Sequence, residues 1–345
     1  MKRRGRGETA PAWAVGGDAE YSALCRALLA HVVPVGEPLV LISQIYRSGG
    51  SLLSQLLDGH PECHAHPHEL RIGRPNSRHW PQLDLDRPET WFERLYEKYA
   101  GKHLRDGYAK TGGDPAPPEN RDVFPFLFLP GLQKRIFDQS VQEARVERER
   151  DVLDCYFTSY FNAWLDNQNL YAQPKRAVTA FAPELGMRPA SREAFFATYP
   201  DGKLVSIIRD PRAWYASARR QRRRDANPEV GIERWRRSAE RTLEAIELHG
   251  DRIVAITFEQ LVLDTDATMQ ALAERIGISM SPTLLVPTFN GRPIRANSAD
   301  RIDRHGVLAE RVDAYRDALD ETTIARVDEL AGDLYDRVRG SAAAL

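Results

Sequence analysis

The sequence predicts a three-layer α/β/α fold with a central parallel sheet, and three short apolar runs support this prediction. Segments 39–45, 204–208 and 253–258 are rich in Val, Ile and Leu at successive positions, as in strands that are buried on both faces. Each run leads into a helical pattern, so strands and helices alternate along the chain. This alternation favours a parallel sheet with helices on both of its faces.

Length and charge limit the organisation of the chain. A chain of 345 residues can bury a full core, and we expect residues 17–345 to form a single α/β domain with a helical insert at about 80–170. Residues 1–16 are predicted to be a disordered tail. The net charge of −1 argues against a dedicated nucleic-acid binder.

Helical periodicity fills the rest of the chain. In the insert it predicts helices at about 133–147 and 152–167, and near the carboxyl end it predicts two amphipathic helices between residues 306 and 339. These last two helices either close the core or form the contact of a homodimer. The basic run at 219–224 reads as a solvated helix end, or as a surface that attracts an anionic ligand.

A turn rich in serine and glycine follows the first predicted strand. It comprises Arg47, Ser48, Gly49, Gly50, Ser51 and Leu52 and leads into a helix that ends near residue 59. The glycines allow close backbone approach and left-handed dihedrals. The start of the helix points its N–H groups and its positive dipole end at whatever the loop holds. The segment therefore predicts a P-loop-like phosphate-binding loop, and the alternative is an ordinary strand-to-helix turn.

The loop lacks the residues of a nucleotide triphosphatase. Such an enzyme needs the pattern G-x-x-x-x-G-K-[ST], in which the lysine and the hydroxyl serve the phosphates and Mg²⁺. Here Gly50 is followed directly by Ser51, and Ile45 stands where the first glycine would be. The pattern favours a phosphate site that works without a metal and makes a P-loop kinase a weaker alternative.

A second strand-to-helix junction begins at Arg209. Asp210 is a natural N-cap and Pro211 a natural first helical residue, so Arg209 stands at the carboxyl edge of the sheet, where open α/β folds bind ligands. Ser217 lies about two helical turns further on and can return its hydroxyl to the same point. An arginine and a hydroxyl that converge there predict a second phosphate pocket.

Together these two segments resemble the sulfotransferase family that uses 3′-phosphoadenosine 5′-phosphosulfate (PAPS). In that family an RSGTT-like loop holds the 5′-phosphosulfate, and an RDPR-x-x-x-x-S-like junction holds the 3′-phosphate. Residues 47–51 match the first motif, with Gly50 in place of the usual threonine, and residues 209–212 with Ser217 match the second. Segments 256–264 and 289–298 resemble the family's downstream strand-helix and its cofactor-covering loop, so the resemblance spans roughly residues 38–300.

The resemblance implies a P-loop sulfotransferase fold of the bacterial, tyrosylprotein and carbohydrate type. It implies transfer of a sulfuryl group from PAPS to a hydroxyl or amine of an acceptor such as a carbohydrate, glycolipid, peptide or small metabolite. No metal is expected to take part. The expected cofactor-binding residues are Arg47, Ser48, Gly49, Gly50, Ser51, Leu52, Arg209, Ser217, Gly291, Arg292 and Arg295, of which Arg47 is also expected to act in catalysis by neutralising the departing phosphate.

The general base is sought in the segment that follows the first helix. In relatives of the tyrosylprotein and carbohydrate types a glutamate just beyond the second strand accepts the proton, and Glu69 lies close to that place with His68 beside it. Glu69 is the predicted base and His68 the reserve. The alternative is that both residues only line a polar loop.

The same segment invites a metal interpretation. His64, His66 and His68 recur at a spacing of two and would share one face of a strand, and catalytic zinc sites do use three histidines. Against zinc, Pro67 would disrupt a central strand, and sulfuryl transfer needs no metal.

The remaining expectations concern location and the competing functions. Three widely spaced cysteines exclude a disulfide framework, and residues 1–17 lack the apolar core of a signal peptide or a membrane anchor, which indicates a cytoplasmic enzyme without a membrane span. Besides the sulfotransferase, a non-catalytic nucleotide-binding relative stays open as a hypothesis.

Overall fold

The computed structural model describes residues 17–76, 78–97, 108–109, 123–221, 227–295 and 304–342. The predicted tail at 1–16 and residues 222–224 of the basic run lie outside the described residues. The helices are α2 (Gly17–Leu29), α3 (Gly50–Asp58), α4 (Trp91–Leu95), α6 (Pro130–Glu143), α7 (Glu149–Ala163), α8 (Pro189–Thr198), α9 (Pro211–Gln221), α10 (Pro228–His249), α11 (Phe258–Leu263), α12 (Thr265–Ile276) and α13 (Glu321–Ala342). The strands are β1 (Leu39–Ile42), β2 (Cys63–Glu69), β3 (Tyr108–Ala109), β4 (Val123–Phe124), β5 (Ala177–Phe181), β6 (Lys203–Ile208), β7 (Ile253–Thr257), β8 (Thr288–Phe289) and β9 (Arg292–Pro293).

A five-stranded parallel sheet forms the middle layer, as predicted. Its strand order is β2-β5-β1-β6-β7, and every neighbouring pair is parallel. The chain leaves β1 toward β2 on one side and later returns to β6 on the other side of β1. The loops that follow β1 and β6 therefore flank a topological switch point, where open α/β sheets bind their ligands.

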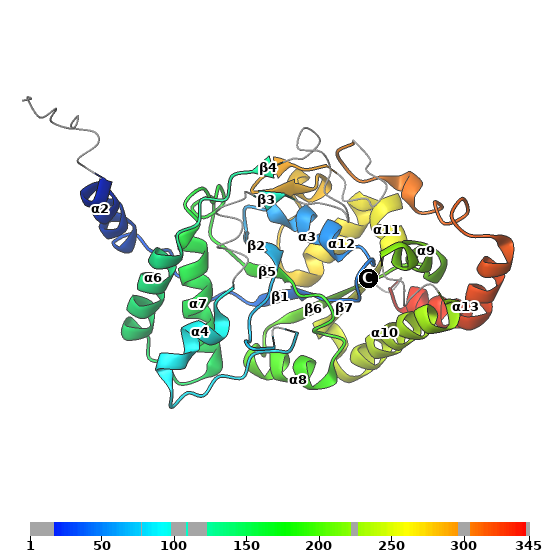
Figure 1. The fold of residues 1–345 in the computed structure, drawn as a ribbon, viewed down its shortest axis with the longest axis horizontal. Coiled ribbons are helices and arrows are strands. Elements are labelled where there is room, and N and C mark those ends of the chain that lie inside the picture. Colours follow the sequence, from blue (N-terminus) through cyan, green and yellow to red (C-terminus); the bar gives the residue numbers. More distant parts are fainter. Residues whose placement is uncertain are drawn as a thin grey trace, which may run out of the picture.

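The two faces of the sheet are covered by different helices, which makes the three layers visible in Figure 1. Val40 and Ile42 of β1 belong to a core cluster with residues of α3, α11 and α12, whereas Leu39 and Leu41 belong to a second cluster with residues of α7 and α8. Alternate side chains of one strand point to opposite faces. Both sets are buried, which explains why β1 reads as a continuous apolar run.

The sheet ends at β2, beyond which α4, α6 and α7 lie at the left of Figure 1. Pro67 lies within this strand, which is at the edge of the sheet and not central. An edge strand tolerates proline because its outer side needs no ladder hydrogen bond. The register of β2 against β5 shifts between Ala65 and Glu69.

Three residues at the carboxyl edge lie in one row across the sheet. Ile42 of β1 is opposite Phe181 of β5, and Phe181 is opposite Glu69 of β2. Neighbouring strands are about 4.8 Å apart, so the backbone of Glu69 is roughly 10 Å from that of β1. Glu69 is thus at the same sheet edge as the predicted phosphate loop.

The prediction of two carboxyl-terminal helices is half wrong. The second is α13, but the first is replaced by a short 3-10 turn, Ala309–Arg311, and further turns. In a helix, each backbone carbonyl would accept a hydrogen bond from the N–H four residues further along the chain. Here the carbonyl of Arg311 accepts from Arg209 Nη2, and that of Ala318 accepts from Arg219 Nη2. Tertiary contacts with the β6–α9 region therefore replace the helix that the apolar spacing indicated.

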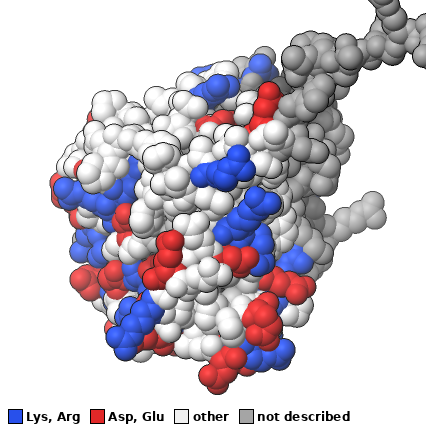
Figure 2. Space-filling model, turned by 90° about the vertical axis from the view of Figure 1, so that its left-hand side faces the viewer, with Lys and Arg blue, Asp and Glu red and all other residues white. Residues whose placement is uncertain are grey.

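The surface over α4, α6 and α7 is mixed in charge. In Figure 2, lysine and arginine side chains alternate with aspartate and glutamate over the visible described residues, with no field of one sign. Ion pairs such as Lys134 with Asp138 and Arg148 with Asp151 contribute to this pattern. Among the described residues no helix is both long and apolar enough to span a bilayer.

Candidate phosphate-binding site

The loop after β1 turns sharply and exposes the start of a helix. Arg47 has a φ of 67° and Gly49 a φ of 106°, both in the left-handed region, where a non-glycine residue is uncommon. α3 begins at Gly50, and its N-cap Gly49 supplies no side-chain hydrogen bond to the helix start. The positive end of α3 therefore faces the loop.

Close packing explains both glycines. A Cβ on Gly49 would lie 2.6 Å from the ring of Phe258. A Cβ on Gly50 would lie 2.4 Å from the ring of Phe181, shorter than any ordinary contact between carbon atoms. The threonine that the sulfotransferase motif usually has at the Gly50 position is thus excluded by Phe181, the residue that also links β1 to β2.

The junction after β6 forms as the sequence predicts. α9 begins at Pro211, and Asp210 Oδ1 accepts a hydrogen bond from the backbone N–H of Arg212 at 2.8 Å, which caps the helix. The guanidinium of Arg212 donates to both carboxylate oxygens of Asp210, at 3.0 and 2.6 Å. Arg212 therefore orients the N-cap residue Asp210, and Arg209 is the arginine that reaches the loop after β1.

The two motifs, which are 170 residues apart in the sequence, are joined directly in space. Arg47 Nε donates to Ser217 Oγ at 2.8 Å. Trp214 Nε1 donates to the carbonyl of Tyr46 at 2.7 Å, and Arg209 Nη1 reaches the carbonyl of Arg47 at 3.5 Å. The Ser217 hydroxyl still has its own proton to donate. An arginine and the Ser217 hydroxyl thus meet at this junction, but the arginine in contact is Arg47; Arg209, which was predicted to converge with Ser217, reaches the carbonyl of Arg47 instead.

Positive charge accumulates at this junction. The guanidinium of Arg209 stacks over the ring of Phe258 at 4.4 Å, and its Nη2 donates to the carbonyl of Arg311 at 3.3 Å. The pKa of Arg209 is lowered to about 10, chiefly by burial and in part by the charges of Arg47 and Arg311, against the opposing effect of Glu259 and Asp210. Like charges held together in a partly dry site are costly without a counter-ion. Three arginines in this arrangement favour a bound anion.

Arg311 is a residue that sequence reasoning missed. It stands in a segment that the apolar spacing assigned to a helix, and no motif marks it. The contact depends on the turn at residues 309–311, which forms only in the folded chain. In the sequence, the basic side chain of Arg311 was the only feature that could have marked it as a candidate for anion binding.

The structure describes residues 289–295 of the predicted cofactor-covering loop, and residues 296–298 lie outside the described residues. β8 and β9 form a hairpin whose turn residues Asn290 and Gly291 have φ values of 52° and 72°. Gly291 N donates to Asp58 Oδ2 at 2.9 Å, at the carboxyl end of α3, whereas the phosphate loop is at its amino end. The structure thus does not bring Gly291 to Arg47. Arg292 follows on the exposed strand β9, and Arg295 forms an isolated bridge to His305.

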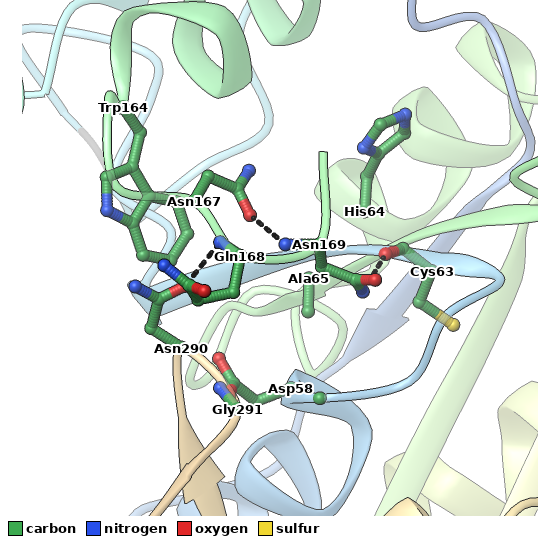
Figure 3. A pocket seen from close by; sticks show the side chains of 11 residues that line it. Asp58, Cys63, His64, Ala65, Trp164, Asn167, Gln168, Asn169, Asn290 and Gly291 are labelled. Carbon is green, nitrogen blue, oxygen red and sulfur yellow. Dashed lines mark hydrogen bonds between the residues drawn. The ribbon is translucent and has the colours of Figure 1, made fainter. Parts of the chain in front are cut away.

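A small polar cavity of about 80 Å³ lies beside this hairpin. Figure 3 shows Asn290 and Gly291 next to Asp58 and Gln168, and the backbone N–H of Gln168 donates to Asn290 Oδ1 at 2.9 Å. The cavity lies at the end of α3 that is remote from the arginines. It therefore belongs to the packing of the hairpin on the sheet and is separate from the phosphate-binding site.

Glu69 and His68 differ in their access to solvent. Glu69, at the end of β2, is 41% exposed and pairs with Arg71. His68 is 7% exposed; its Nε2 lies 3.2 Å from the hydroxyl of Tyr160, and its Nδ1 lies 3.3 Å from the carbonyl of Glu69. An acceptor substrate at the sheet edge can reach the carboxylate more easily than the imidazole.

The three histidines of the zinc interpretation do not gather. His64 stacks on Phe161, with ring centroids 5.0 Å apart, and burial lowers its pKa to about 3. His66 and His68 instead approach Glu97, a residue that the sequence analysis did not select.

Comparisons with known proteins identify similar chains. The model of the sulfotransferase family matches residues 38–282. Among solved structures, the sulfotransferase domain from the curacin biosynthetic pathway is 15% identical with a TM-score of 0.47, and the match covers 85% of this chain and 96% of that chain. The sulfotransferase domain of the Synechococcus PCC 7002 olefin synthase is 18% identical with a TM-score of 0.45, covering 87% and 96%. A mouse sulfotransferase complexed with PAP is 12% identical with a TM-score of 0.40, covering 94% of each chain. No curated protein matches the chain.

The arginine cluster predicts how an anion will affect stability. Arg311→Gln should leave the free energy of unfolding of the ligand-free protein within about 0.5 kcal/mol of wild type, because lost repulsion offsets lost contacts. The rise in Tm on adding sodium sulfate should be clearly smaller in this variant. Thermal unfolding over a sulfate series measures both effects. Arg316→Gln, which removes an exposed arginine of the same segment, is the control, and equal sulfate responses of the two variants would contradict the prediction.

Proposed function

Because the chain belongs to the sulfotransferase family, we propose that it transfers a sulfuryl group from PAPS to a hydroxyl or amine of an acceptor. The acceptor classes that we consider are carbohydrates, glycolipids, peptides and small metabolites. The observation that supports this proposal most is the contact of Arg47 with Ser217 at 2.8 Å, since it places the two predicted phosphate clamps side by side. A nucleotide with phosphates on both its 3′ and 5′ positions requires two such clamps.

The charged groups have distinct roles in the proposed reaction. Arg47 and the N–H groups at the start of α3 bind the 5′-phosphosulfate, and Arg209 with Ser217 binds the 3′-phosphate. As the sulfur–oxygen bond to the phosphate breaks, negative charge grows on the departing phosphate oxygen. A fixed guanidinium and fixed backbone N–H groups stabilise that charge without reorganising. Loss of the Arg47 guanidinium is expected to cost on the order of a hundredfold in rate.

Glu69 is the proposed general base. It stands in the same row of the sheet as Ile42 and Phe181, at the edge where the loop after β1 emerges. Its exposed carboxylate can accept the acceptor's proton as the new oxygen–sulfur bond forms. The ion pair with Arg71 orients the carboxylate. His68 remains the reserve candidate, although its side chain faces Tyr160 in the interior.

One observation favours a non-catalytic relative as the second candidate. The carboxylate of Glu69 already forms an ion pair with Arg71. In a non-catalytic relative this pair would keep Glu69 from acting as the base, while the nucleotide-binding residues would be retained. A P-loop kinase is less favoured, because the loop has no Lys-Ser/Thr pair. The cytoplasm stays the proposed location; the three cysteines are buried free thiols, which suit a reducing compartment.

Calorimetric titration with adenosine 3′,5′-bisphosphate, the desulfated product, tests the cofactor proposal. Without added metal the wild type should bind it, and an Arg209→Ala/Ser217→Ala double variant should lose about a hundredfold or more in affinity, because two charge-assisted or hydroxyl contacts to one phosphate disappear. Arg237→Ala/Ser341→Ala, which alters an exposed arginine and a serine on other helices, is the matched control. Equal affinity of the two double variants would remove the basis of the proposal.

A Glu69→Gln variant separates the two candidate functions. If Glu69 is the base, the variant should bind the bisphosphate as wild type does but lose on the order of a hundredfold or more in kcat, since general-base catalysis contributes about that much. The rate is measured as the transfer of sulfuryl groups from PAPS to a panel of hydroxyl and amine acceptors. A wild type that binds nucleotide but is inert toward every acceptor would favour the non-catalytic relative.

A further inference from the structure

The ring of His66 lies between two oxygen acceptors. Its Nδ1 is 2.8 Å from the carbonyl of His68, and its Nε2 is 2.9 Å from Glu97 Oε1. A carbonyl can only accept, so Nδ1 carries a proton and donates it. A neutral imidazole has a single N–H, and its Nε2 then presents a lone pair to the carboxylate. Two electron-rich atoms at this distance need a positive centre between them, which is either a proton or a metal ion.

A third donor points to the same place. His68 Nδ1 lies 4.0 Å from Glu97 Oε2, and one ligand atom from each of His66, His68 and Glu97 can be chosen so that all three lie within 4.8 Å of one another. His68 Nδ1 also lies 3.3 Å from the carbonyl of Glu69, so a bound ion would take the place of this long hydrogen bond. A proton needs two donor atoms, whereas a metal ion needs at least three. The side chains are 0%, 7% and 1% exposed, respectively, so solvent does not satisfy them.

We propose that His66, His68 and Glu97 bind one divalent transition-metal ion of the zinc type. Two imidazole nitrogens and one carboxylate oxygen form a donor set that zinc uses in proteins, with bond lengths of about 2.0–2.2 Å. In a tetrahedral site with such bonds the donor atoms are roughly 3.3 Å apart. The measured nitrogen–oxygen distances, 2.9 Å from His66 Nε2 to Oε1 and 4.0 Å from His68 Nδ1 to Oε2, involve the two different oxygens of Glu97 and lie on either side of this value. The fourth ligand that a tetrahedral zinc ion requires would be a water molecule.

The surroundings fix the ligands as a metal site requires. The carbonyl of His68 holds Nδ1–H of His66 and thereby sets its tautomer, an arrangement usual for metal-binding histidines. The backbone N–H of Arg71 donates to Glu97 Oε2 at 2.8 Å, and the hydroxyl of Tyr156 lies 3.4 Å from Oε1. Burial raises the pKa of Tyr156 well above its usual value, so this phenol stays protonated and acts as a donor.

The ion would have a structural role. It would tie the carboxyl end of β2, where Glu69 stands, to the residues that follow α4 in the helical region beyond the sheet edge. Glu69, the proposed base of sulfuryl transfer, is not a ligand of the ion; of the three ligands only His68, the reserve candidate for the base, also belongs to that scheme. The metal proposal therefore does not rest on the proposed function. The sequence analysis weighed zinc on His64, His66 and His68; the structure retains two of these histidines and replaces His64 with Glu97.

Zinc uptake by the full chain tests the proposal. Protein stripped with a chelator is dialysed against zinc chloride and its metal content measured. We expect about one zinc per chain in wild type and less than about a tenth in Glu97→Gln, with zinc raising the Tm of wild type only. Glu193→Gln is the matched control, because Glu193 forms a surface pair with His249 at 3.0 Å and should leave zinc uptake unchanged.

Cobalt provides a test that does not depend on the variant folding. Wild type loaded with Co²⁺ should show the visible bands of a four-coordinate nitrogen and oxygen site, without the near-ultraviolet band of a thiolate ligand. A thiolate band would place the metal on a cysteine and overturn the proposal. Failure of wild type to take up zinc, or equal uptake by Glu97→Gln, would overturn it too. In that case imidazolium ¹⁵N shifts for His66 at pH 7 would identify the positive centre as a proton.

Discussion

The hydrogen bond from Arg47 to Ser217 is the contact on which the rest of the site depends. It joins the loop after β1 to the helix after β6, and it is possible only because the parallel sheet places these two strands next to each other. The supporting contacts, from Trp214 to Tyr46 and from Arg209 to Arg47, use backbone carbonyls. The adjacency of β1 and β6 and these side-chain donors together hold the loop after β1 against the helix after β6.

Charge and packing oppose each other at this point. Arg47, Arg209 and Arg311 repel one another, and Arg209 is also desolvated. The rings of Phe181 and Phe258 lie against the glycines of the loop and leave no room for side chains there. Rigid apolar packing thus keeps cationic groups together when no ligand is present. In the proposed function, the anionic co-substrate would offset the repulsion among these groups.

The sequence was sufficient for the features that depend on local pattern. The buried strands and the start of α9 at Pro211 follow from apolar runs and capping chemistry. The sequence could not predict the features that depend on contacts between distant segments. Arg311 lies beside Arg209 because a turn stands where a helix was predicted, and its carbonyl accepts a hydrogen bond from Arg209. Glu97 meets the histidines from a distant segment, and the backbone N–H of Gly291 donates to Asp58 at the carboxyl end of α3.

The most direct test of the account compares three nucleotides on the wild-type protein without added metal: adenosine 3′,5′-bisphosphate, adenosine 5′-monophosphate and adenosine 3′-monophosphate. Two clamps that each bind one phosphate should make the bisphosphate bind about a hundredfold or more tighter than either monophosphate. Similar affinities for all three, or binding that appears only with Mg²⁺, would contradict the claim that the β1 and β6 junctions form a paired phosphate site.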